Sequence, residues 1–502
     1  MKQTKTLLTI IAVMFCIPAA VSAQELFTVG GIVYSITPGQ TVEVQPYYNL
    51  LNNPYSGAVS IPQTVEYDGT VYTVTALGEM AFESCTGVTS LTLPATIRNI
   101  GSYCFYNCNF TSLQLPDSLR TLGDHAFLYS RVGSLHLPAC FEEYSEGSFW
   151  GRNLTSITVD DANPHYRSMD GWLYSRDSTT LCIVPDGVWW TINVPPFVRH
   201  IGKQAFGFNS NSTSITLPEG LISIGDFAFN ICQSVNNIVI PSTVTYIGKC
   251  PFSYCPDLTN LSIAEGNTHY VMDGLMIYSS DFDTLVSCHK SGATVTLNPN
   301  LKVLGGFENN TWVRNIDIPA GVTDILDNCF NGCAFTSIEM PTHLKSIGSL
   351  AFATNRSLRS VRIQQVDTLN VAVFSQTNLD HIRFTVGIPP VVKGLGPLYD
   401  VVSLDSIVVP CGSLNAWLSD SYWGQFADLY VEDCNIGFDD PNANIINIYT
   451  HGGRIIVDGA NDETGRIFDI TGRCVRNEAL PTGVYIVKVG NRPARKIVVV
   501  KQ

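Results

Sequence analysis

The sequence predicts a mainly β solenoid in which short, similar coils stack on one another, and two observations carry this prediction. A phrase recurs along the chain, Ile-Gly-x-x-Ala-Phe, and a strand-like Leu-x-Leu-Pro follows it. The Phe of this phrase advances by 22 or 23 residues, apart from two steps of 57 and 55. A period of this length is typical of leucine-rich repeats, in which one coil cannot bury its apolar face without a neighbour. The Phe series is Phe82, Phe105, Phe127, Phe149, Phe206, Phe229, Phe252, Phe307, Phe330, Phe352 and Phe374.

The start of the chain has the features of a signal peptide, predicted over residues 1–23. Lys2 and Lys5 precede an apolar run that is too short to span a bilayer, and Val21-Ser22-Ala23 offers a small-residue cleavage site. No later stretch is long and apolar enough to cross a membrane. We therefore expect an exported protein without a transmembrane segment; a retained N-terminal anchor is the alternative. The net charge of −14 argues against nucleic-acid partners, because an acidic chain repels phosphate backbones.

Residues 24–73 alternate apolar and polar positions in short runs separated by Gly, Pro and Asn, which predicts strands and hairpins. We interpret this segment as an N-terminal β cap on the first coil. Residues 74–385 then form the repeats. In each, Leu-x-Leu directs two apolar side chains inward and one outward, and Pro ends the strand. We expect Ile-Gly to be a turn in which Gly permits a tight or positive-φ bend, and Ala-Phe to be one helical turn whose Phe fills the coil.

The two long Phe steps contain similar inserts, near residues 160–190 and 264–295. Each has Asp-Gly between apolar runs, which predicts a hairpin or one extra coil. His165 and His269 occupy equivalent positions in these inserts, so repetition explains them better than a paired site does. Residues 386–435 lose the period and contain Trp417 and Trp423, as expected of a C-terminal cap. A polar linker (436–445) and a small β-sandwich (446–502) complete the expected organisation.

The chain has 15 cysteines, and Cys16 would leave with the signal peptide. Fourteen cysteines would then remain. An even number of cysteines in an exported chain raises the question of disulfides. Many of them, however, hold fixed repeat positions, either three residues after a Phe or directly before it, where a small buried side chain fits. We favour structural packing for these and leave disulfide or metal roles as alternatives. Cys411 and Cys434 lie outside the repeats and form the better disulfide candidate.

The candidate binding face consists of the outward residue of each Leu-x-Leu strand. Stacked at about 4.8 Å per coil, these residues would form an extended strip, which suits a protein or polymer partner better than a small molecule. The row also contains Val239 and has no aromatic anchor. The candidate site residues are Thr92, Gln114, His136, Thr158, Thr216, Ser262, Asp317, Glu339 and Arg362.

Residues 24–435 resemble the BspA-type leucine-rich repeat proteins of bacteria. The resemblance rests on Ile-Gly-x-x-Ala-Phe, Leu-x-Leu-Pro, the Asp-Gly inserts, and a closing segment with Cys411 and Trp423. It implies an exported surface protein, and several members are described as adhesins that bind host proteins or take part in coaggregation.

The last 57 or so residues resemble the C-terminal sorting domain of the type IX (Por) secretion system. The matching segments are 469–473, 480–489 and 496–500. The resemblance implies recognition by that secretion machinery in a Bacteroidetes-type bacterium.

No catalytic motif appears in the sequence: there is no phosphate-binding Gly loop, no His-Glu-x-x-His and no Gly-x-Ser-x-Gly. We therefore expect a protein that is not an enzyme, has no cofactor and binds no metal. The predicted function is that of a secreted or cell-surface binding protein, adhesin-like, for a protein or polysaccharide partner. The alternative is a structural envelope or biofilm component that acts by self-association.

Overall fold

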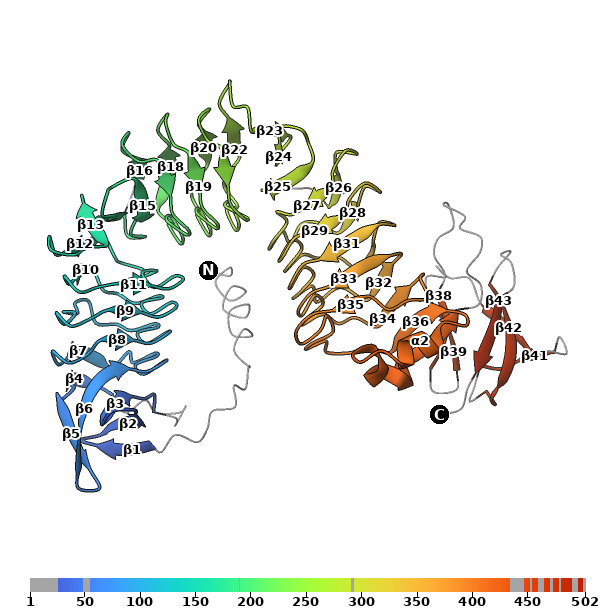
Figure 1. The fold of residues 1–502 in the computed structure, drawn as a ribbon, viewed down its shortest axis with the longest axis horizontal. Coiled ribbons are helices and arrows are strands. Elements are labelled where there is room, and N and C mark those ends of the chain that lie inside the picture. Colours follow the sequence, from blue (N-terminus) through green and yellow to red (C-terminus); the bar gives the residue numbers. More distant parts are fainter. Residues whose placement is uncertain are drawn as a thin grey trace, which may run out of the picture. The chain divides into compact units, whose positions relative to one another are not determined.

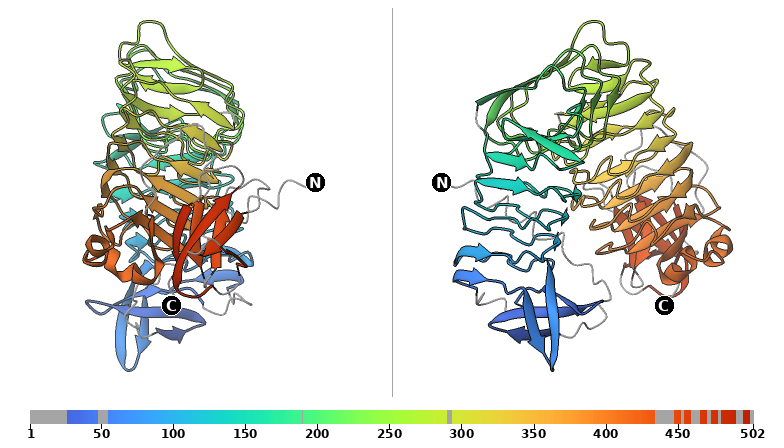
Figure 2. Two further views of the ribbon diagram at one scale, coloured as in Figure 1. Left: turned by 90° about the vertical axis from the view of Figure 1, so that its right-hand side faces the viewer. Right: turned by 60° about the vertical axis from the view of Figure 1, so that its left-hand side comes forward.

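The computed structural model describes residues 26–47, 55–188, 190–289, 293–433, 447–451, 454–458, 465–469, 473–477, 480–489 and 495–499. The expected signal peptide (1–23) and linker (436–445) lie outside these residues. The chain divides into two compact units: unit 1 is Met1–Trp190 with Gln204–Asn211, and unit 2 is Thr191–Lys203 with Ser212–Gln502. Within each unit, successive coils place their strands side by side, which confirms the predicted solenoid (Figures 1 and 2).

Unit 1 begins with a small sheet that precedes the regular coils. Strands β1, β2 and β3 are antiparallel, β3 then pairs in parallel with β6, and β5 pairs antiparallel with β6. The Tyr55 ring lies 5.1 Å from the Phe82 ring, so this region covers the first Phe of the series. The strands are β1 (Leu26–Val29), β2 (Ile32–Thr37), β3 (Thr41–Val44), β5 (Thr64–Tyr67) and β6 (Thr70–Leu77).

The Leu-x-Leu segments form parallel pairs that we call the front ladder. Their alternation follows the expectation: in β10, Leu135 and Leu137 are buried, while His136 is exposed. In unit 1 the strands are β4 (Gly57–Ser60), β7 (Val88–Thr92), β10 (Ser134–Leu137) and β12 (Ser156–Val159). In unit 2 they are β16 (Trp190–Asn193), β18 (Ser212–Thr216), β20 (Asn237–Ile240), β22 (Asn260–Ile263), β26 (Thr294–Thr296), β28 (Asn315–Asp317), β30 (Ser337–Glu339), β32 (Ser360–Ile363), β34 (His381–Phe384), β36 (Ser406–Pro410) and β37 (Tyr430–Asp433).

The Ile-Gly segments, expected to be turns, form a second parallel ladder of short strands, most of them two residues long. In unit 1 it follows the order β6, β8 (Asn99–Ile100), β9 (Thr121–Leu122) and β11 (Glu143–Tyr144). In unit 2 one run is β17 (His200–Ile201), β19 (Ser223–Ile224) and β21 (Tyr246–Ile247), and another is β27 (Val303–Leu304), β29 (Asp324–Ile325), β31 (Leu344–Ile347), β33 (Val366–Leu369) and β35 (Val391–Val392).

The glycine of Ile-Gly is required for a reason other than the expected backbone bend. Gly101, Gly123 and Gly225 have no positive φ. A Cβ built on Gly123 would lie 2.5 Å from the Ser102 nitrogen, and one on Gly225 would lie 2.8 Å from the Gly202 carbonyl carbon. The neighbouring coil therefore approaches too closely for any side chain at these positions.

The Ala-Phe segments are hydrogen-bonded turns rather than the helical turns we expected. Alternate N–H groups bond within the coil and across coils: Ala81 N donates to Gly78 O (3.3 Å), whereas Phe82 N donates to Cys104 O (2.9 Å) of the next coil. The residues two before and two after a Phe commonly have positive φ, as at Tyr103 (53°) and Asn107 (56°). Such φ values are incompatible with a right-handed helix, and they turn alternate N–H groups toward the next coil.

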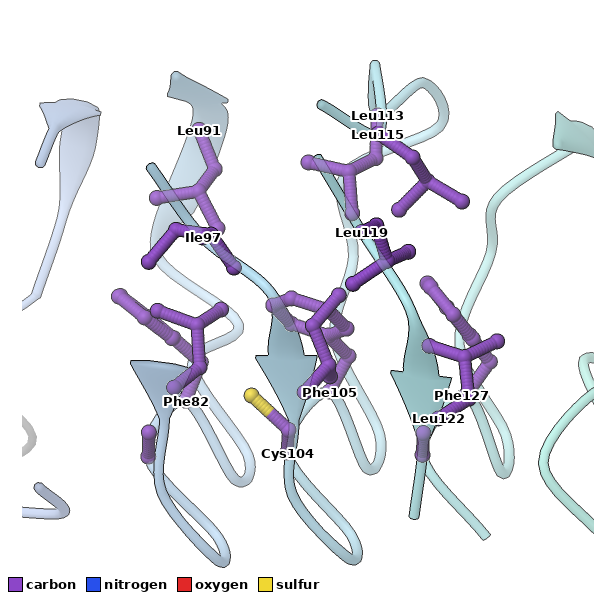
Figure 3. Close-up of a cluster of buried hydrophobic side chains, with 14 of the residues drawn as sticks. Phe82, Leu91, Ile97, Cys104, Phe105, Leu113, Leu115, Leu119, Leu122 and Phe127 are labelled. Atoms are coloured by element: carbon purple, nitrogen blue, oxygen red, sulfur yellow. The ribbon is translucent and has the colours of Figure 1, made fainter. Parts of the chain in front are cut away.

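The Phe side chains form the core column that the spacing predicts. All eleven are at most 2% exposed. Figure 3 shows Phe82, Phe105 and Phe127 in successive coils, each near the buried Leu and Ile side chains of its own coil. Adjacent rings of this series lie 5.1 to 6.1 Å apart where both belong to one unit and the contact is described, for example Phe330 and Phe352 at 5.1 Å.

Each insert adds an antiparallel three-stranded segment. The strands are β13 (Tyr166–Met169), β14 (Trp172–Ser175) and β15 (Thr180–Ile183) in unit 1, and β23 (Tyr270–Asp273), β24 (Met276–Ser279) and β25 (Thr284–Cys288) in unit 2. An Asn begins both: the Asn163 amide donates to Pro138 O and Phe141 O, and its carbonyl accepts from the two following amides, His165 N and Tyr166 N. Asn267 repeats the pattern. The equivalent His residues thus follow a structural Asn, and both are exposed.

Asp186, close after the first insert, is 6% exposed, and its Oδ1 has no hydrogen-bond partner among the described residues. Burial raises the pKa of this carboxyl well above its usual value. A carboxyl whose folded-state pKa exceeds the unfolded value stabilises the fold only at low pH, and this stability is lost as the pH rises through the folded pKa.

We therefore expect Asp186→Asn to raise the free energy of unfolding by about 1–3 kcal/mol near pH 8 and by much less near pH 3. Urea unfolding of both proteins at several pH values measures this difference. A pH-independent difference would contradict the assignment.

Unit 2 ends with a short helix, a 3₁₀ segment and a group of antiparallel strands. Helix α2 (Leu414–Leu418) and the 3₁₀ segment η1 (Trp423–Leu429) bring Trp417 and Trp423 together, with ring centroids 5.3 Å apart and both side chains fully buried. After residue 446 the strands are β38 (Asn447–His451), β39 (Arg454–Asp458), β40 (Gly465–Asp469), β41 (Cys474–Val475), β42 (Gly483–Val489) and β43 (Arg495–Val499). All pairings described within this group are antiparallel.

Candidate binding face

The outward row of the front ladder contains the nine residues proposed from the sequence. Eight of them are exposed, and Arg362 is partly exposed. Parallel register brings neighbours together: His136 pairs with Thr158, and their side chains form a 2.9 Å hydrogen bond. The segment around Gln114 lies in no regular strand, although Leu113 and Leu115 are still buried on either side of it.

The charged part of the row lies in unit 2. Glu339 and Arg362 are opposite each other in β30 and β32, with Oε1 and Nε 3.5 Å apart. The Gln364 amide also donates to Glu339 Oε1 at 2.9 Å. At about one fifth to two fifths exposure, such a pair contributes at most about 1 kcal/mol to stability. Its arrangement therefore says more about what the surface can contact than about what holds the fold together.

Two members of this charged group, Arg383 and Asp433, were not predicted from the sequence. Arg383 follows Arg362 in register in β34, and its guanidinium pairs with the Asp433 carboxylate from β37. His381 stands at the start of β34, where many strands of the front ladder have Ser or Asn. His381 is buried, however, and bonds to the Ser406 side chain (3.1 Å), so the ladder continues. The alternation of Ile382 and Phe384 around Arg383 was the available signal.

The structure shows a hydrogen-bonding role for several of the cysteines that lie three residues after a Phe. Three of the five donate the thiol to the carbonyl of the preceding Phe in the series: Cys108 to Phe82 (3.0 Å), Cys255 to Phe229 (3.0 Å) and Cys333 to Phe307 (3.3 Å). Asn355 does the same to Phe330 with its amide (2.7 Å). The twelve free cysteines among the described residues include all those at repeat positions, which favours structural packing.

A pair of substitutions tests this donor role. We expect Cys255→Val to be less stable than Cys255→Ser by about 1 kcal/mol, because Val removes one of the two hydrogen bonds that the buried Phe229 carbonyl accepts and leaves only the one from Cys232 N (3.3 Å). Thermal and urea unfolding of the two variants give the comparison. If Val is as stable as Ser or more so, the site needs only an apolar side chain.

Cys411 is disulfide-bonded. Its backbone N–H bonds to Asp433 O (3.0 Å), and Pro410 pairs with Asp433 at the end of β36 and β37. The expected partner, Cys434, lies outside the described residues. The pairing itself thus stays a prediction.

No group of three or more His, Cys, Asp or Glu side chains within the described residues is arranged to hold a metal ion. Among the residues that the structure describes, no helix is both long and apolar enough to span a membrane.

One family model matches the chain, described as "BspA type Leucine rich repeat region", in six copies over residues 68–168, 189–285 and 288–391. No curated protein matches the sequence. Among solved structures, the chain is similar to a leucine-rich repeat protein from Eubacterium ventriosum, with 21% identity, a TM-score of 0.39, and coverage of 66% of this chain and 94% of the other. A leucine rich cell surface protein from Faecalibacterium prausnitzii has 21% identity, a TM-score of 0.33, and coverage of 77% and 89%. A leucine-rich repeat protein from Bacteroides ovatus has 21% identity, a TM-score of 0.30, and coverage of 72% and 94%.

Proposed function

Because the chain belongs to the BspA type leucine-rich repeat family, whose model matches most residues from 68 to 391, we propose that it is a non-enzymatic binding protein. Its partner would be a protein or polysaccharide, and its place the exterior of a bacterial cell, either secreted or on the outer surface. Proteins of this family are typically found at the cell surface. The apolar start of the sequence and the sorting-like end support export, and both belong to the proposal.

The observation that carries the proposal is the register of the charged row. Glu339, Arg362 and Arg383 occupy successive strands at matching positions, so their head groups emerge from one side of the sheet. Both signs of charge and several hydrogen-bonding groups are present, while the flanking apolar side chains are buried. A row of this kind offers directional contacts to an extended polar partner, and a rigid ladder holds it without loss of backbone entropy on binding.

The first experiment is a screen of the secreted form against glycan and host-protein arrays. Hits are then titrated against the variant Asp317→Ala/Glu339→Ala/Arg362→Ala. We expect this variant to weaken binding by about tenfold or more, because the contacts removed are charged. The comparison variant is Thr92→Ala/Thr158→Ala, which changes the same row in unit 1 without removing charge and should weaken binding less than the triple variant does. Unchanged affinity in the triple variant would place binding elsewhere and contradict the proposed face.

Light scattering at increasing protein concentration distinguishes the alternative role. Assembly that grows with concentration, together with arrays that show no ligand, would favour a structural component that acts by self-association. A monomer that binds a specific array member supports the binding protein.

A further inference from the structure

Six aromatic side chains on the Ala-Phe turns of unit 1 form a closed circuit of contacts, which we call the aromatic cluster. Tyr103 stacks on His125, with ring centroids 5.0 Å apart and the planes 5° from parallel. The other neighbours are Tyr103 and Tyr106 at 6.1 Å, Tyr106 and Tyr129 at 5.8 Å, Tyr129 and Phe208 at 5.5 Å, Phe208 and Trp150 at 5.0 Å, and Trp150 and His125 at 5.1 Å.

The repeat itself does not call for these aromatic residues. They lie one or two positions from a buried Phe, where coils of unit 2 vary and have Asn328, Leu350 and Thr354 as well as Phe227 and Tyr254. All members except Trp150 remain partly exposed, so they contribute a surface next to the core column rather than the column itself. The cluster is therefore a local feature added to a fold that forms without it.

The rim of the aromatic cluster is acidic. The pKa of Tyr103 is raised to about 12, mainly by burial, and the carboxylates of Asp124, Glu146 and Glu79 contribute to this rise. The pKa of Tyr106 is also raised, first by burial and second by the Glu83 carboxylate. All four of these acidic residues are exposed to solvent. A negative potential over ring faces favours a cation, because the face of an aromatic ring is itself electron-rich.

The chain already places one cation on this surface. The Arg152 Cζ lies 4.9 Å from the centroid of the Tyr129 ring, within the range of a cation–π contact. Arg152 also lowers the pKa of Tyr106 and of Tyr129. The surface therefore already accepts a guanidinium on a ring face.

We propose that the aromatic cluster and its four carboxylates form a docking surface for an extended segment of a partner protein that carries Arg or Lys. A guanidinium suits the surface best, because it stacks on rings and donates to carboxylates with the same planar group. This surface lies on the turns of unit 1, separate from the front ladder, and so extends the proposed function to a second kind of contact.

The test uses the full chain and a labelled peptide in which Arg and Gly alternate, with a citrulline–Gly peptide of equal length as reference. Fluorescence anisotropy gives Kd at low and high salt. We expect the arginine peptide to bind at least about tenfold more tightly than the citrulline peptide, and to weaken as salt is added. Tyr106→Leu/Tyr129→Leu keeps the apolar bulk but removes two ring faces, and should weaken binding by about tenfold.

Tyr254→Leu is the matched control, because Tyr254 follows its Phe by two residues, as Tyr129 does, but belongs to unit 2. It should leave Kd unchanged. The variant Glu79→Gln/Glu83→Gln/Asp124→Asn should weaken binding and flatten the salt dependence, and it carries the test if the double Leu variant does not fold by circular dichroism. Equal binding of both peptides, or an equal loss in the Tyr254 control and the double Leu variant, overturns the proposal.

Discussion

We expect Phe330→Ala to lower the free energy of unfolding by about 3–5 kcal/mol, the largest effect of any single substitution considered for this protein. Phe330 is fully buried and is surrounded by the rings of Phe307, Phe352 and Phe335, at 5.2, 5.1 and 5.2 Å. Its backbone N–H also bonds to Ala351 O (2.7 Å), so the coil is held at a fixed distance from its neighbour. A cavity left by Ala therefore cannot close by moving the coils together.

Urea unfolding followed by circular dichroism measures this loss. Because coils in a repeat protein can unfold in part, amide hydrogen exchange over β29 to β31 should accompany it. Phe197→Ala is the control in the same unit: Phe197 is 43% exposed, and we expect a loss below about 1 kcal/mol. Equal losses at the two positions would mean that the Phe column contributes little beyond an ordinary side chain.

The second large effect is expected at Gly123. Gly123→Ala should lower the free energy of unfolding by about 1–3 kcal/mol or more, because a Cβ there would overlap backbone atoms of Gly101 and Ser102, 2.5 to 3.0 Å away. These atoms belong to the second ladder, where Gly123 N bonds to Ile100 O (2.8 Å). Relief of the overlap would require the two coils to separate, which breaks that hydrogen bond.

Gly133→Ala provides the comparison, since the nearest atom to a Cβ at Gly133 is Thr111 O at 3.9 Å, an ordinary contact. We expect it to change stability by less than about 1 kcal/mol. Thermal unfolding of both variants in the same buffer decides the matter. If the Gly123 variant is as stable as the Gly133 variant, close approach of the coils is not the reason why Gly recurs after Ile in the repeats of this chain.

These two expectations concern different directions of the same packing. The Phe column fills the inside of each coil, whereas the Ile-Gly glycines set how closely one coil lies on the next. The charged row on the front ladder depends on both, because Glu339, Arg362 and Arg383 meet only if successive coils keep one register. Its role in binding stays a prediction.

The sequence by itself determined the features that repeat. The 22- to 23-residue period identifies equivalent positions, and the alternation of Leu-x-Leu assigns each to the inside or the outside. From these follow the solenoid, the buried Phe column and the outward placement of the nine candidate residues. Each is a local property of one coil, so one sequence suffices to reveal it.

Only the tertiary structure decided which contacts form between neighbouring coils. The Ile-Gly glycine has no special φ, and its need arises from the backbone of the adjacent coil. The Ala-Phe turn alternates its hydrogen bonds with a neighbour that a local pattern does not contain. The Arg383–Asp433 pair joins residues 50 positions apart, and Phe208 joins the aromatic cluster through Trp150 and Tyr129, which are 58 and 79 positions away. Periodicity states which residues are equivalent, but the distance and offset between coils, set by the ladders, determine which of them touch.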